Sequence, residues 1–173
     1  LAAYRQSAAL EGAPADRLLR AVRALSQTGE LEEAEALLAA LEGRQESLSR
    51  GQKRHVLHRR AELHAKRGTP DKALRIYEGL LKQHPLDGEA LLQAGRLLYQ
   101  QEAYEQALTY FERAQRIDEV KAEALVGAAQ IAVARQQYSK AASLLRESLE
   151  IDERPGVRDY LQQVQSAAAS AGE

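Results

Sequence analysis

The chain has 173 residues, of which 45% are hydrophobic and 28% charged, and its 24 basic residues nearly balance its 25 acidic ones. This balance argues against an acidic tail or a continuous basic coat for nucleic acid. The absence of cysteine excludes disulfides, thiolate metal sites and thiol nucleophiles. No apolar run reaches the roughly 18 residues of a membrane-spanning helix, so we expect no membrane span in this segment. None of these features indicates a cellular compartment.

Apolar and small residues recur at helical spacing along the chain, and this pattern predicts a series of helices. Residues 1–12 look like the trailing helix of a preceding unit. Four helix pairs are expected at 15–43, 52–85, 88–119 and 122–153. A final helix is expected over 155–168, with one apolar face for the preceding core and one polar face for water.

The polar stretch 43–51 separates the first pair from the second. The step from Ala34 to Ala73, two corresponding small residues, is 39 residues, although later pairs repeat every 34. The additional residues therefore fall within 43–51. They form either a binding loop or a tolerated insertion, because lengthening a loop costs little free energy.

The third pair shows the repeat most clearly. Large apolar and small residues alternate at fixed positions: Leu91, Ala94, Gly95, Leu98, Tyr104, Ala107, Phe111 and Ala114. The same layout returns 34 residues later as Leu125, Ala128, Ala129, Tyr138, Ala141 and Leu145. A helix–turn–helix period of this length is typical of a solenoid whose units bury their apolar faces only against their neighbours.

This series resembles the tetratricopeptide repeat (TPR) family over nearly the whole chain. The family's first large aromatic is replaced by Leu in all four pairs: Leu18, Leu57, Leu91 and Leu125. Its turn glycine is present as Gly29 and Gly68 but becomes Glu102 and Gln136 in the later pairs, where we expect less regular turns. The resemblance implies an all-α, right-handed superhelical solenoid of antiparallel helix pairs. It would form one domain over 1–173, excised from a longer protein.

In this family the first helices of successive repeats line a concave groove that holds a segment of another protein. Carried onto this chain, the groove residues are Leu19, Arg20, Arg23, His55, His58, Arg59, Glu62, Glu89, Leu92, Gln93, Arg96, Tyr99, Glu123, Val126, Gln130 and Tyr160. The resemblance therefore predicts a protein–protein interaction scaffold. The Ala-, Arg- and Leu-rich composition suggests a module of a bacterial assembly or secretion-related protein.

The groove residues are basic and polar in the N-terminal half and more apolar beyond Tyr99. An acidic or mixed acidic–apolar partner segment would fit them. One alternative is a polyanion, nucleic acid or acidic polysaccharide, because the stretch from Arg50 to Arg67 holds seven Lys and Arg against Glu62 alone. No aromatic residue interleaves that stretch for base stacking, so nucleic acid is the less expected partner. Another alternative is self-association through residues 1–12.

Catalytic and metal chemistry find little support in the sequence. His55, His58 and Glu62 share one helical face, but no fourth ligand accompanies them, so we expect no metal. There is no Gly-rich phosphate loop and no serine with a plausible His–acid partnership. We therefore expect neither an enzyme nor a cofactor.

Overall fold

The structure is a computed structural model that describes residues 13–171. These residues form nine α-helices and one short 3-10 turn, and this range contains no strand. The chain divides into two compact units, unit 1 (Leu1–Gln83) and unit 2 (His84–Glu173). The expected trailing helix over 1–12 lies outside the described residues. The expectation of one continuous solenoid domain stays a prediction.

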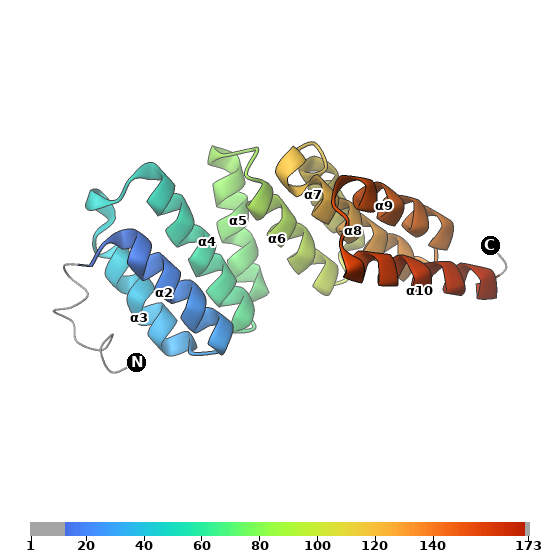
Figure 1. Ribbon diagram of the computed structural model, residues 1–173. Coiled ribbons are helices and arrows are strands. Elements are labelled where there is room, and N and C mark those ends of the chain that lie inside the picture. The colour runs from blue at the N-terminus through green and yellow to red at the C-terminus, as the bar shows by residue number, and fades with distance from the viewer. Residues whose placement is uncertain (1–12, 172–173) are drawn as a thin grey trace. The chain divides into compact units, whose positions relative to one another are not determined.

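Unit 1 contains two helix pairs (Figure 1). The helices are α2 (Ala15–Thr28), α3 (Leu31–Glu42), α4 (Arg50–Lys66) and α5 (Pro70–Gln83). The core formed by α2, α3 and α4 holds Leu18, Val22, Leu38 and Leu41, all at most 1% exposed, because apolar residues recur on one face of α2 and of α3.

The connection over 43–51 is ordered and anchored in that core. It contains the 3-10 turn η2 (Gln45–Ser47), followed by Leu48, which is buried among the core side chains of α2 and α3. Ser49 then caps α4: its hydroxyl accepts the Gln52 N–H, and the Gln52 side chain accepts the Ser49 N–H. This capping box fixes the start of α4.

Unit 2 contains two further pairs and a last helix. The helices are α6 (Gly88–Gln100), α7 (Tyr104–Ala114), α8 (Asp118–Ala134), α9 (Tyr138–Ile151) and α10 (Pro155–Ala171). Helix α8 begins before the expected residue 122, since two carboxylates in its first turn, Asp118 and Glu119, favour a helix start there. Helix α10 packs on α9 and continues past the expected end at 168.

All four helix pairs turn in the same way. The turn residues have positive φ angles of 88° at Gly29, 70° at Gly68, 59° at Glu102 and 58° at Gln136. After each, the next N–H donates to the carbonyl five residues back, at 2.9 Å in every case, as from Ala103 to Leu98. The expectation of less regular turns at the two non-glycine sites is therefore wrong. Those residues adopt the left-handed conformation that the hydrogen bonds require.

One residue of the first helix of the second pair does not lie in the core as expected. Leu57, expected in the core, is 37% exposed, whereas the neighbouring Val56 is 3% exposed. Val56 and Leu63 are seven residues apart, hence on one helical face, and both belong to the unit 1 core.

Candidate partner-binding faces

Most side chains expected in the groove reach the surface at least in part. They are Arg20, Arg23, His55, Arg59, Glu62, Glu89, Gln93, Arg96, Tyr99, Glu123, Val126, Gln130 and Tyr160. Leu19, His58 and Leu92 are instead 7%, 2% and 4% exposed, which contradicts their expected place on the groove surface. Leu19, His58 and Leu92 occupy equivalent positions in the first helices of the first three pairs. Leu19 lies in the unit 1 core, and the His58 ring packs 5.8 Å from that of Tyr77. This position therefore serves helix packing.

The two units carry opposite net charge, which the neutral balance of the whole chain hides. Residues 13–83 hold 14 Lys and Arg against 10 Asp and Glu, a net charge of +4. Residues 84–171 hold 9 against 13, a net charge of −4. The exposed groove residues therefore form two chemically different faces, one on each unit.

On unit 1, α2 carries several exposed arginines. Arg20 and Arg23 are exposed, and so is Arg17, which the family pattern does not include. Its spacing of three residues from Arg20 could have revealed it. On α4, Arg59 is bound by Glu62, with Nη1 to Oε2 at 2.6 Å. The α4 arginine therefore contributes less free positive charge than the sequence suggests.

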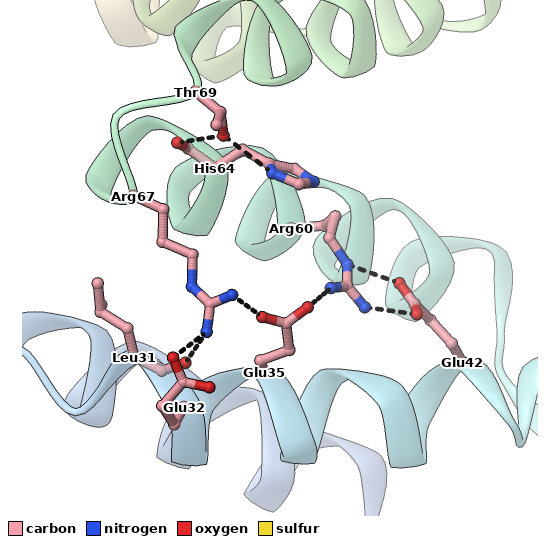
Figure 2. A network of polar contacts seen from close by, with 8 residues as sticks. All are labelled: Leu31, Glu32, Glu35, Glu42, Arg60, His64, Arg67 and Thr69. Carbon is pink, nitrogen blue, oxygen red and sulfur yellow. Dashed lines mark hydrogen bonds and ion pairs between the residues drawn. The ribbon is translucent and has the colours of Figure 1, made fainter.

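The basic stretch from Arg50 to Arg67 is neutralised in part by the acidic residues of α3 (Figure 2). Arg60 donates through Nε to Glu42 Oε1 at 3.0 Å and through Nη2 to Glu42 Oε2 at 2.5 Å. Its Nη1 donates to Glu35 Oε1 at 3.1 Å. Two of the three guanidinium nitrogens thus hold one carboxylate in a fork, and the third holds another.

Arg67 completes this network from the end of α4. It pairs with Glu35 and, at 2.9 Å, with Glu32, and Nη2 also reaches the Leu31 carbonyl at 3.4 Å (Figure 2). The network joins α3 of the first pair to α4 of the second. Because Arg60 and Arg67 are engaged within unit 1, the stretch offers a polyanion fewer cations than its sequence implies.

His64 lies beside this network, in the last turn of α4. The Thr69 hydroxyl donates to the His64 carbonyl at 2.9 Å, and His64 Nδ1 lies 3.2 Å from the same hydroxyl oxygen. Burial, followed by the positive charges of Arg60 and Lys72, lowers the pKa of His64 below its usual 6.5. The fold therefore favours the neutral imidazole.

On unit 2, the charged residues of the face pair with one another. Arg96 of α6 reaches Glu123 of α8 at 2.9 Å, and Arg154 approaches the other oxygen of Glu123 at 3.8 Å. Arg154 also contacts Asp152 at 3.0 Å. With both signs mutually paired, this part of unit 2 presents little net charge to a ligand.

Two half-buried tyrosines, Tyr99 of α6 and Tyr160 of α10, belong to this unit. Burial and then the neighbouring Tyr99 raise the pKa of Tyr160 above its usual value. The Tyr99 ring also lies 5.7 Å from that of Tyr104. Tyr160 and Val126 both pack on the core formed by α8, α9 and α10. We call Tyr99, Val126 and Tyr160 the tyrosine face.

Neither a metal site nor a membrane span emerges from the described residues. No group of three or more His, Asp or Glu side chains between residues 13 and 171 is arranged to hold a metal ion. His55 is exposed while His58 is buried, so these two do not share a surface. Within the same range no helix is long and apolar enough to cross a membrane.

Sequence comparison matches a tetratricopeptide repeat family model to residues 58–122. No curated protein matches the sequence significantly. Among solved structures, YrrB, a TPR protein with an unusual peptide-binding site, is 19% identical, with a TM-score of 0.66 over 94% of this chain and 81% of its own.

Two further solved structures share the fold. PilF of Pseudomonas aeruginosa is 18% identical, with a TM-score of 0.71 over 92% of this chain and 77% of its own. A TPR protein of Parabacteroides merdae is 25% identical, with a TM-score of 0.69 over 98% of this chain and 66% of its own. The predicted all-α TPR-type solenoid fold is confirmed.

TPR proteins are generally non-catalytic scaffolds for protein–protein interaction, and the fold found here supports that general role. Residues 58–122 thus match the tetratricopeptide repeat family, and solved structures that share the helix-pair fold are TPR proteins, as the sequence resemblance predicts.

Proposed function

We propose that this chain is an interaction module that binds an extended segment of a partner protein, and that the tyrosine face of unit 2 is one contact surface. Two observations carry the proposal: the half-buried Tyr160 packs with Val126 on the core of α8, α9 and α10, and Tyr99 on the same unit is also only half-buried. Partly exposed tyrosines offer large apolar area with a polar tip and little rotamer entropy to lose, which suits them to protein recognition.

The surroundings of this face favour an apolar or aromatic anchor on the partner. Arg96 and Glu123 neutralise each other, so a single charge on the partner would have to compete with an existing ion pair. Gln93 of α6 and Gln130 of α8 are partly exposed, and their amides offer donors and acceptors to an extended backbone. Peptide binding by YrrB, which has this fold, is consistent with the proposal.

Selection of peptides from a random dodecamer library on the immobilised full chain tests the proposal. We expect enriched peptides to carry an aliphatic or aromatic residue and to bind at least about tenfold more weakly to a Tyr99→Ala/Tyr160→Ala variant, given the ~2 kcal/mol typical of such anchors. Tyr99→Phe/Tyr160→Phe keeps the rings and should retain most of the peptide affinity, and circular dichroism checks that the Ala variant folds.

An Arg146→Ala variant on α9 is the matched control. Arg146 is exposed and lies outside the face, so its loss should leave peptide affinity unchanged. If Tyr99→Ala/Tyr160→Ala and Arg146→Ala weaken peptide binding equally, the tyrosine face is not the contact surface. The absence of any enriched peptide on wild type would refute it as well.

A further inference from the structure

In unit 1, three arginines of α2 differ from Arg59, Arg60 and Arg67 in what surrounds them. Arg60 and Arg67 are held by the carboxylates of α3, and Arg59 is held by Glu62. Arg17, Arg20 and Arg23 of α2 are exposed, and within residues 13–171 they form no ion pair or side-chain hydrogen bond. The three arginines of α2 are therefore available to a ligand.

The three available arginines lie along one helical face. Successive spacings of three residues keep side chains on neighbouring positions of a helix surface. Asp16, the single acidic residue in α2, accepts a hydrogen bond from Gln52 Nε2 at 3.1 Å. No carboxylate follows at the positions three and four residues after any of the three arginines. We call Arg17, Arg20 and Arg23 the arginine stripe.

We propose that the arginine stripe of α2 is a second docking surface, whose partner is an acidic segment of a protein. Guanidinium groups pair with carboxylates through two parallel hydrogen bonds, and unit 1 carries a net charge of +4 over residues 13–83. Helix α4 packs beside α2 and adds the exposed Lys66 to the same unit. Charge complementarity thus selects an anionic partner.

A protein segment fits this surface better than a nucleic acid does. Base recognition in single strands relies on exposed aromatic rings. Tyr77 is the one Phe, Tyr or Trp residue among the described residues of unit 1, and it is 1% exposed. The arginine stripe can therefore pair with carboxylates, but the described residues of unit 1 provide no exposed Phe, Tyr or Trp ring on which a base could stack.

The test measures binding of a labelled dodecapeptide of alternating Glu and Ser to the full chain at about 50 mM salt. The comparison variant Arg17→Gln/Arg20→Gln/Arg23→Gln should bind about tenfold more weakly, the sum expected for three exposed ion pairs. A Lys72→Gln/Arg75→Gln/Lys82→Gln variant removes equal charge from exposed positions of α5 and should stay within about twofold of wild type.

Other outcomes would overturn the proposal. Equal loss in both triple variants would assign the binding to net charge alone. Tighter, stripe-dependent binding of a twelve-nucleotide single strand would assign it to nucleic acid, and concentration-dependent sedimentation lost with the stripe would assign it to a second copy. No peptide binding by wild type would also refute it. The Tyr99→Ala/Tyr160→Ala variant should bind the acidic peptide normally, so this proposal and the proposed tyrosine face fail independently.

Discussion

The ring of Phe111 in α7 lies directly against the backbone of Gly127 in α8. A Cβ added at Gly127 would stand 2.5 Å from Cε1 and from Cζ of the ring, closer than real Cβ atoms approach their neighbours. The same ring faces Gly95 of α6, where an added Cβ would come within 2.8 Å of Cε1. Phe111 is 1% exposed, so its ring joins three helices of unit 2 where two glycines make room.

A Gly127→Ala substitution should therefore destabilise the protein by about 1–3 kcal/mol, because the ring has to shift within a packed core. The measurement is urea unfolding followed by circular dichroism. Gly79→Ala in α5 is the matched control: nothing lies within 4 Å of an added Cβ there. That change should stabilise by about 0.5–1 kcal/mol through helix propensity alone. Equal effects of the two substitutions would contradict the packing described for Phe111.

The left-handed turn at Glu102 offers a change that should stabilise unit 2. Its φ of 59° is unfavourable for a residue with a Cβ. Glu102→Gly removes that strain but gives the unfolded chain more freedom, so we expect a net gain of about 0.5 kcal/mol.

Thermal unfolding compares this variant with Gln106→Gly, which places glycine at an exposed site inside α7. The second change should cost about 1 kcal/mol. A loss of stability in Glu102→Gly would show that the glutamate itself contributes to the turn.

Loss of the guanidinium group at Arg60 should weaken the junction between α3 and α4. Its side chain is 16% exposed and it bonds both Glu35 and Glu42. Arg60→Gln leaves two partly buried carboxylates without that cation, so we expect a cost of about 1–2 kcal/mol at low salt. The cost should shrink in about 1 M salt, which screens the remaining repulsion.

Arg75→Gln on α5 is a suitable control, because this exposed arginine lies outside the network. Its effect should stay within about 0.5 kcal/mol. If the two variants unfold at the same urea concentration, the network does not stabilise the junction.

The helix pairs could be predicted from sequence because short-range spacing shows the repeat. Small residues recur where two helices touch, and turn residues recur between them. The sequence does not predict which apolar residue near the start of α4 is buried. Val56 and Leu57 are adjacent apolar residues, and the burial of Val56 rests on its contacts with the core of α2 and α3, which local spacing does not show.

The charge of the candidate faces could not be predicted from the sequence. Arg60 and its partner Glu35 are 25 residues apart in the chain, so no local pattern shows that the basic stretch of α4 is neutralised. The burial of His58 against Tyr77 likewise depends on a contact between two helices. The family pattern correctly places residues on the first helices, but the exposure of each side chain is decided by its tertiary neighbours.

His64 should make the stability of unit 1 depend on pH. Burial and the nearby cations lower its pKa in the folded protein, whereas the unfolded chain keeps a value near 6.5. As pH falls through 6.5 toward the folded pKa, the unfolded state binds more protons than the folded state. The contribution of His64 is thus fully present above pH 6.5 and is lost as the solution becomes more acidic.

Urea unfolding of wild type and His64→Gln at pH 7.5 and pH 5.5 measures this dependence. Glutamine keeps an amide near Thr69 but does not titrate. Because protonation disfavours only the wild-type fold, the stability of wild type relative to the variant should decrease at pH 5.5. His55 and His84 are exposed and remain in both proteins, so their titration cancels in the comparison. A difference between the two proteins that is the same at both pH values would show that His64 binds protons equally in the folded and unfolded states.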